Sequence, residues 1–337
     1  EMQKDRILLA HGSGGKLMHE LIENLIVPPF KNPILELLDD AAVIDLGGIK
    51  IAYTTDSYVV DPIFFKGGDI GKLAVNGTVN DIAMCGGTPL YLTASLIIEE
   101  GFPISDLNRI ILSMKNAAEE ARVEVVAGDT KVVNAHSADK IFINTSGIGV
   151  VPKGVSISGV NAKPGDKVIV SGYIGDHGIS ILSQREDLGL ETDISSDCAP
   201  LNDLVAHMLK TSNKIHVLRD PTRGGVATVL NEIAIRSNVG VIIEEEKVPI
   251  REGVRVACEI LGIDPFYVAS EGKLIAVVAP EDAPPILESM RSHKYGRDAE
   301  VIGSIVREPA GAVVLKTLVG GKRIVDMLVG EQLPRIC

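Results

Sequence analysis

Five aspartates share a setting that suits metal chemistry. Each stands at the end of an apolar segment or in a helix of small apolar residues, outside any run of charges: Asp39, Asp40, Asp56, Asp81 and Asp129. Brought together, such carboxylates would repel one another unless cations neutralised them. Clusters of oxygen ligands are typical of Mg²⁺, which usually also takes phosphate oxygens and water. The pattern therefore predicts a magnesium site. The alternative for each single aspartate is a cap or turn residue.

Three glycine-rich turns could receive the phosphates of such a substrate. Backbone N–H groups exposed ahead of a helix bind anions, and the segments 12–15, 67–71 and 223–225 have this character. Turns of this kind also serve only to reverse the chain. The chain has four Gly-Lys pairs, none followed by Ser or Thr, which excludes a P-loop. A nucleotide site would therefore depend on a metal held by carboxylates.

The last residue, Cys337, is a candidate nucleophile. From Gly330 onward the extended chain reaches at most ~25 Å, enough to enter a site on this chain or on a partner. Arg335 would favour the thiolate, and the terminal carboxylate would oppose it. The alternative is a frayed terminus.

Three polar residues could take part in proton or phosphate transfer. His177 stands in a turn framed by glycines, and Lys131 and Glu271 stand at strand ends. Each could equally be an ordinary turn or surface residue. Among the remaining cysteines, Cys85 and Cys258 are expected in the core, and Cys198 is expected in a polar loop.

Hydrophobic periodicity positions these residues on two mixed domains. Helices are expected over 69–84, 105–121, 178–185, 200–211, 224–236 and 283–292, with Ser105 as an N-cap. Strands are expected over 42–44, 49–54, 90–98, 123–127, 141–150, 167–171, 239–244 and 273–279. We expect an α/β (α+β) fold in which each domain is a sheet with helices on one face. The divisions are a lead segment over 1–36, domains over 37–151 and 152–325, and a flexible tail over 326–337.

Composition limits the possible partners. The 33 basic and 45 acidic residues give a net charge of −12, which argues against nucleic-acid binding. The sequence contains no stretch of 18 apolar residues, so no membrane span is predicted. The charged segment over 1–6 does not read as a signal peptide, so we expect a cytoplasmic protein with reduced thiols.

Together these segments resemble the HypE family of hydrogenase maturation factors, in the aminoimidazole ribonucleotide synthetase superfamily. The resemblance covers nearly the whole chain. The segments that carry it are 12–15, 39–42, 54–57, 67–81, 127–133, 175–178, 219–225, 271–274 and the terminal Pro334-Arg335-Ile336-Cys337. The glycine-rich and acidic segments fit the superfamily in general, and the terminal motif is specific to HypE.

The resemblance implies two domains of the aminoimidazole ribonucleotide synthetase type and a homodimer paired through the N-terminal sheets, with ATP bound near the interface. It implies that the carbamoyltransferase HypF loads a carbamoyl group on Cys337. ATP then drives dehydration of this thiocarboxamide to a thiocyanate. The cyanide passes to iron on a HypC–HypD complex, for a [NiFe]-hydrogenase.

This chemistry suggests roles for the candidate residues. Asp40, Asp56, Asp81 and Asp129 would hold Mg²⁺, and the same aspartates would bind ATP with Gly12, Ser13, Gly14, Gly15 and Asn76. Lys131 would stabilise the transferring phosphate, Glu271 would accept protons with help from His177, and Cys337 would carry the substrate. The alternatives are another ATP-dependent enzyme of the superfamily, such as a small-molecule kinase or a selenophosphate synthetase-like enzyme, and a passive thiol carrier.

Overall fold

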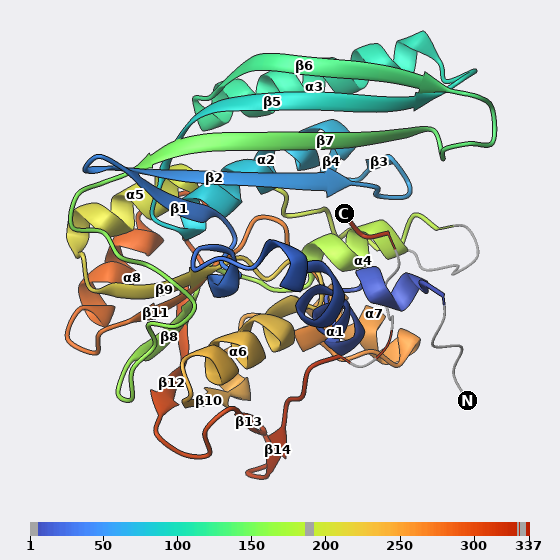
Figure 1. The fold of residues 1–337 in the computed structure, drawn as a ribbon. Coiled ribbons are helices and arrows are strands. Elements are labelled where there is room, and N and C mark those ends of the chain that lie inside the picture. Colours follow the sequence, from blue (N-terminus) through green and yellow to red (C-terminus); the bar gives the residue numbers. More distant parts are fainter. Residues whose placement is uncertain (1–5, 186–191, 329, 331–334) are drawn as a thin grey trace.

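The computed structural model describes residues 6–185, 192–328, 330 and 335–337, and its helices and strands form two αβ domains (Figure 1). The expected lead segment folds into short turns around α1 (Lys16–Leu21). A π-helical turn over Ile22–Ile26 continues α1, and Pro28–Phe30 forms a 3₁₀ turn beyond it. The first helical segment thus ends at Pro28 and Pro29.

The first domain is built on a sheet of five strands in the order β1-β2-β7-β5-β6. Its strands are β1 (Ala42–Leu46), β2 (Ile49–Tyr58), β5 (Thr88–Glu99), β6 (Glu124–Val133) and β7 (Ile141–Val151). All neighbours are antiparallel except β5 and β6. A small hairpin, β3 (Phe64–Phe65) and β4 (Gly68–Asp69), leads into α2 (Ile70–Met84).

The helices α2 and α3 (Ile104–Ala121) pack on one face of this sheet, as expected. Asp69 caps α2 through bonds from the Gly71 and Lys72 amides. The prediction that Ser105 caps α3 is wrong. The helix already begins at Ile104 after Pro103, and no side chain caps it.

The other face of the first sheet and its β6 edge have no covering element within the described chain. Tyr53, Tyr91 and Ile97 are 48%, 46% and 42% exposed on this face. Nine of the ten β6 residues are exposed. In Figure 1 the strands β6, β5, β7 and β2 lie side by side in the upper part of the view, with α3 next to β5 and β6. An open edge with apolar neighbours is a ready surface for pairing with another chain.

The second domain contains a sheet of seven strands in the order β14-β13-β10-β12-β8-β11-β9. They are β8 (Lys167–Val170), β9 (Ile215–Arg219), β10 (Gly240–Glu244), β11 (Ile275–Val278), β12 (Glu300–Val306), β13 (Val313–Lys316) and β14 (Lys322–Ile324). Its helices are α4 (Asp176–Leu182), α5 (Asn202–Thr211), α6 (Gly225–Arg236), α7 (Glu252–Leu261) and α8 (Ala283–Arg291).

Helices cover both faces of this second sheet, so the expectation of a single covered face is wrong here. Ala276 and Val278 of β11 pack with α5 and α8. Their neighbours Ile275 and Val277 pack with α6 on the opposite face. A strand buried on both sides has a continuous apolar sequence, whereas a strand buried on one side alternates.

The central helix α2 joins the two domains. It buries every residue except Lys72 and Asp81. Its last turns, with Ile82 and Met84, share a core with α5 and α8 of the second domain. Asp81 therefore stands at the junction of the domains. Within the described parts of the chain, we find no helix with the length and hydrophobicity of a membrane-spanning segment.

Candidate active site

Four carboxylates meet at this junction from four different elements. Asp40 precedes β1, Asp56 lies in β2, Asp81 in α2, and Asp220 directly follows β9. Burial raises the pKa of Asp81, and Asp56, Asp220 and Asp40 raise it further. Burial raises the pKa of Asp220 to about 6, against the lowering effect of Arg219. These mutual effects show that the carboxylates lie close together and that their negative charges are poorly compensated.

Few protein cations offset this charge. Arg219 Nη1 lies 3.0 Å from Asp40 Oδ1, and Arg219 also pairs with Glu232. Glu232 accepts from His19 at 2.8 Å, which ties α1 to the network. The second oxygen of Asp40 is buried without a partner. Asp81 Oδ2 accepts a 2.9 Å bond from the Thr54 hydroxyl. A set of hard oxygen donors that is short of positive charge fits Mg²⁺.

Asp39 differs from its neighbour Asp40. Its carboxylate accepts bonds of 2.7 Å from Ser158 Oγ and 2.8 Å from the Gly159 amide. The turn-residue alternative therefore describes Asp39, which fastens the segment between the two domains.

Asp129 and Lys131 do not join the cluster within one chain. Both are exposed on β6, where Lys131 Nζ lies 2.6 Å from Asp129 Oδ2. The bond from Lys131 lowers the pKa of Asp129. Across the sheet, Asp56 pairs with Thr145, Thr145 with Ala94, and Ala94 with Gly128. Three strand spacings, ~14 Å, therefore separate Asp129 from Asp56.

The end of the expected tail lies beside the cluster in the same chain. The Val59 amide donates to Cys337 O at 3.1 Å, and the Asp61 amide donates to Arg335 O at 3.1 Å. Arg335 Nε donates to Val59 O, and Arg335 also pairs with Asp139. The last residues thus lie antiparallel to the segment that follows β2. In Figure 1 the C-terminus lies beside α4, below β2. Pro334 is outside the described residues.

His177 positions this tail. Its Nε2 lies 2.8 Å from Ile336 O and its Nδ1 lies 2.8 Å from Ser196 Oγ. Burial lowers the pKa of His177, so the ring is neutral and Nε2–H donates to the carbonyl. The predicted role of proton acceptor does not fit, because both ring nitrogens already have partners.

Cys337 has charged neighbours from both domains. Burial raises the pKa of its thiol, Arg223 lowers it, and Glu271 raises it. Glu271 is 3% exposed, and one of its oxygens, Oε1, is buried without a partner. Its pKa is raised by burial and then by Asp220, and it is lowered by Arg223. The terminal cysteine and the predicted base are therefore neighbours, as expected.

The glycine-rich segment 12–15 borders the same place. Arg223 Nη1 donates to Gly12 O at 3.1 Å, and the Lys16 amide donates to Leu328 O at 2.7 Å. Gly14 has φ +77°, and a Cβ there would lie 2.6 Å from Arg223 O. Only glycine fits this approach. The segment thus connects the Arg223 loop with the chain that leads to the tail.

Asn76, predicted to bind the nucleotide, is fully buried on α2. Its amide nitrogen lies 3.5 Å from Cys198 Sγ, and its Oδ1 is without a partner. Cys198 is buried in the same core as Tyr58 and Ile336. The expectation that Cys198 lies in a polar loop therefore misses its burial against the site.

Sequence reasoning did not assign a role to Asp220, Arg223 and Arg219. All three lie in the run 219–225, which was noted as a resembling segment and, over 223–225, as a glycine-rich turn. A usable signal was present: Arg219 ends β9 and Asp220 follows it, and charged residues at the end of a largely apolar strand must find partners there.

A second group of possible metal ligands does not fit a metal. Asp203, His207 and His293 lie within ligand distance of one another. However, His293 Nδ1 accepts from the Tyr295 amide at 3.2 Å. The proton must then lie on Nε2, which faces Asp203 Oδ2 at 3.4 Å as a donor.

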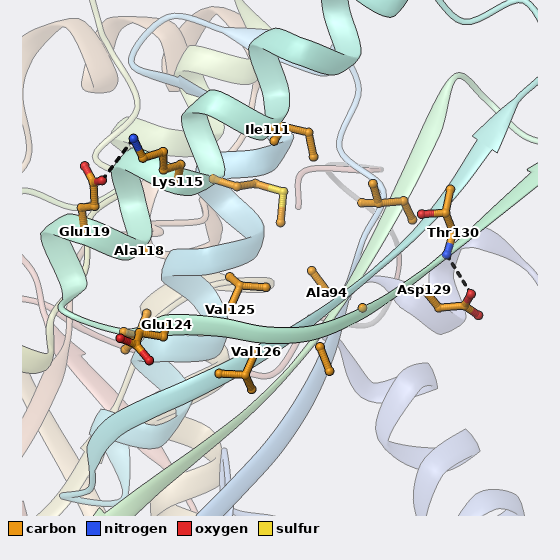
Figure 2. A pocket seen from close by; sticks show the side chains of 15 residues that line it. Ala94, Ile111, Lys115, Ala118, Glu119, Glu124, Val125, Val126, Asp129 and Thr130 are labelled. Carbon is orange, nitrogen blue, oxygen red and sulfur yellow. Dashed lines mark hydrogen bonds and ion pairs between the residues drawn. The ribbon is translucent and has the colours of Figure 1, made fainter.

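A groove of about 980 Å³ lies between α3 and β6. Figure 2 shows Ile111 and Lys115 of α3 on one side and Val125, Val126 and Asp129 of β6 on the other. The four junction carboxylates do not line it. It belongs to the open edge of the first sheet.

Comparisons with known proteins agree with this architecture. Residues 38–151 match the N-terminal domain of AIR synthase related proteins, and residues 163–316 match the C-terminal domain. Carbamoyl dehydratase HypE of Azotobacter vinelandii is 52% identical over 337 residues, covering 100% of this chain and 99% of that protein.

Solved structures show the same likeness. A chain in a crystal structure of a HypE–HypF complex is 53% identical with a TM-score of 0.87, over 91% of this chain and 99% of that one. HypE in complex with ATP is 50% identical with a TM-score of 0.83, over 98% of this chain and 100% of that one. With this identity over its whole length, the chain belongs to the HypE family of carbamoyl dehydratases.

Proposed function

We propose that the protein uses ATP to dehydrate a carbamoyl group carried on Cys337, giving a thiocyanate. One observation carries the proposal: the chain's own terminal cysteine is docked beside Glu271, Arg223 and the junction carboxylates. A passive carrier would have no need to bring its thiol to a cluster of buried acids. The relatives named carbamoyl dehydratase and the ATP complex of a HypE support the same reaction.

The reaction needs a leaving group and a base. The thiocarboxamide must lose its oxygen and both N–H protons to become a nitrile. Transfer of the γ-phosphoryl group to the amide oxygen lets that oxygen leave as phosphate, so the products are thiocyanate, ADP and phosphate. The base must remove the protons while phosphate departs.

The chain supplies these functions from the residues around the tail. Asp40, Asp56, Asp81 and Asp220 would hold Mg²⁺, which when bound offsets the charge of the phosphates. The segment 12–15 would cover the phosphates with its backbone N–H groups. Glu271 would accept protons, because its raised pKa makes its ionised form a stronger base. Arg223 favours that ionised form.

We propose a homodimer in which the open β6 edge completes the site of the second copy. Asp129 and Lys131 are exposed on this edge and lie far from their own chain's cluster. Their predicted roles with Mg²⁺, ATP and the transferring phosphate would then be played across the interface. The bare face with Tyr53 and Tyr91 supports the same arrangement.

Loading and delivery would need further proteins. We propose that HypF transfers the carbamoyl group, as the HypE–HypF complex of a relative suggests. A HypC–HypD complex would receive the cyanide for the iron of a [NiFe]-hydrogenase. The docked Cys337 is only partly exposed and its thiol has a raised pKa, so we propose that the tail leaves its site to be loaded. All four cysteines are free thiols, which suits a cytoplasmic reaction.

The test is the mass of the C-terminal peptide after incubation with HypF and its substrates. We expect Cys337 to gain one carbamoyl group and then, only with Mg²⁺ and ATP, to lose one water. Cys337→Ala should accept no carbamoyl group and should still bind ATP. An adduct that stays hydrated would indicate a carrier. No adduct with an active transferase would favour a small-molecule kinase or a selenophosphate synthetase-like enzyme.

A further inference from the structure

Two buried acceptor atoms near the docked cysteine have no hydrogen-bond partner. They are Asn76 Oδ1 and Glu271 Oε1. Their residues are 0% and 3% exposed. Buried polar atoms without partners are costly, and native proteins keep few of them. Two of them beside one thiol indicate that something polar completes them.

Backbone contacts connect the end of the tail with α2. Cys337 O accepts from the amide of Val59, the residue after Tyr58. Tyr58 Oη reaches the surface of α2 at Gly77, where a Cβ would lie 2.1 Å from it. Tyr58 and Val59 therefore link the tail with the part of α2 that contains Asn76 and Gly77.

Contacts on α2 and in the loop after α4 bring Asn76 and Glu271 to the same place. Asn80, one turn after Asn76, donates to Glu271 O at 3.4 Å. Asn76 itself contacts Cys198, which shares a core with Ile336 and Cys337. Asn76 Oδ1 and Glu271 Oε1 thus lie along one helix face, with the end of the tail against it.

The free thiol cannot satisfy these atoms, because S–H is a single weak donor. A carbamoyl group on the sulfur adds two N–H donors and one carbonyl oxygen. The two unpartnered acceptors, an amide oxygen and a carboxylate oxygen, match the two N–H groups. These two acceptors therefore lack what a primary carboxamide supplies.

We propose that Asn76 determines specificity for the carboxamide, its Oδ1 accepting one N–H of the group on Cys337 while Glu271 faces the other. This inference rests on the proposed function. It moves Asn76 from the nucleotide, where the sequence placed it, to the substrate carried by the tail. A carboxylate or N-alkylated group on the sulfur would leave Asn76 Oδ1 unpaired, so the pocket rejects it.

The first experiment reads this contact without ATP or a partner protein. Cyanate at neutral pH carbamoylates the thiol directly, and Cys337→Ala treated alike reports reaction elsewhere. We expect loading to raise the melting temperature of the wild-type protein and to leave that of Asn76→Leu unchanged. An equal shift in both proteins would overturn the proposal.

A matched variant separates this role from a structural one. Unloaded Asn76→Leu should be at least as stable as wild type, because the change removes a buried oxygen without a partner. Asn80→Leu should be less stable, because Asn80 bonds Ala199 O, Glu271 O and the Leu201 amide. A large loss of stability in unloaded Asn76→Leu would make the residue structural and would overturn the assignment.

The second experiment measures single-turnover dehydration of carbamoylated protein together with ATP affinity. We expect Asn76→Leu to slow dehydration about 10- to 100-fold, the cost of one lost hydrogen bond, with unchanged ATP affinity. Asn76→Asp keeps an acceptor and should recover part of the rate. A parallel loss of ATP affinity would return Asn76 to the nucleotide and overturn the proposal. If loaded wild type fails to dehydrate, the proposed function fails, while the thermal shift still decides the contact of Asn76.

Discussion

Asp81 and Asp129 were both expected in one metal site, yet the chain surrounds them in opposite ways. Asp81 stands on a helix buried along almost its whole length, and burial and neighbouring carboxylates raise its pKa. Asp129 lies on an exposed edge strand, where Lys131 lowers its pKa. Few protein cations offset the carboxylates around Asp81, whereas Lys131 already offsets the carboxylate of Asp129.

This difference shows which part of the proposed site forms within a single chain. The junction carboxylates, Glu271 and the tail come together within a single chain, so their geometry depends on the packing of α2 between the domains. An exposed pair on an open strand can act on a buried substrate only when another surface brings it there. The β6 edge is therefore where a second copy must act, if Asp129 and Lys131 belong to the site.

The largest expected effect is that of Asp81→Asn. The change removes a proposed Mg²⁺ ligand, so ATP-dependent dehydration should fall on the order of 10³-fold or more. The melting temperature should stay equal or rise, because a buried carboxylate with a raised pKa is lost. Asp39→Asn is the matched control: it should destabilise the segment over 152–163 and spare turnover. Unchanged turnover in Asp81→Asn would remove this carboxylate from the site.

A smaller loss, about 100-fold, is expected for Asp129→Asn, with an unchanged melting temperature because the side chain is exposed. Mixing tests whether the residue acts in the second copy. Asp81→Asn and Asp129→Asn protomers, unfolded and refolded together, should regain about a quarter of wild-type activity, because half of the dimers are mixed and each holds one intact site. Activity that stays at the level of the separate variants would contradict a shared site.

Much of the fold follows from hydrophobic periodicity. The helix over 69–84 and the long strands of the first sheet are confirmed, because apolar spacing decides where long elements form. The coverage of the second sheet was missed. Ile275–Val278 is apolar on both faces, and its length alone does not distinguish one covering layer from two. Ser105 was chosen as a cap on residue type, although Pro103 already starts the helix one residue earlier.

The candidate site was predictable in chemistry and only partly in membership. Carboxylates at the ends of apolar segments or in an apolar helix predicted an acidic cluster, which the structure places at the domain junction, and the terminal cysteine predicted a thiol that could reach it. Sequence spacing does not show that β2 and β6 lie three strands apart, so Asp56 and Asp129 looked equivalent. The single-chain docking of the tail depends on backbone bonds to Val59 and Asp61, which any residue type could make. Side-chain patterns therefore could not reveal it.

The smallest expected effect is a change in the pH dependence of stability, which distinguishes the buried carboxylates from the exposed one. Burial raises the pKa of Asp220 to about 6 from 3.8 in an unfolded chain. Between these two pH values the Asp220 carboxyl is protonated in the folded protein and ionised in the unfolded chain. Its contribution to stability is therefore present below about pH 4 and lost as the pH rises through 6. Asp220→Asn should thus stabilise the protein by about 3 kcal/mol at pH 7, and this advantage should fall to about 1 kcal/mol at pH 4.5.

The comparison of variant with wild type isolates this carboxyl from other titrating groups. His177 and His293 have lowered pKa values and oppose the trend, but they do so equally in both proteins. Glu232, with its pKa lowered to about 2, stays ionised throughout this range. Denaturant unfolding at pH 4.5 and 7 measures the difference, with the exposed Glu259→Gln as a control expected to show none. Saturating Mg²⁺ and ATP should stabilise wild type more than Asp220→Asn, because bound cations favour the ionised carboxylate. Equal stabilisation of both would mean that Asp220 lies outside the metal cluster, and the contrast with Asp129 would then rest on Asp40, Asp56 and Asp81 alone.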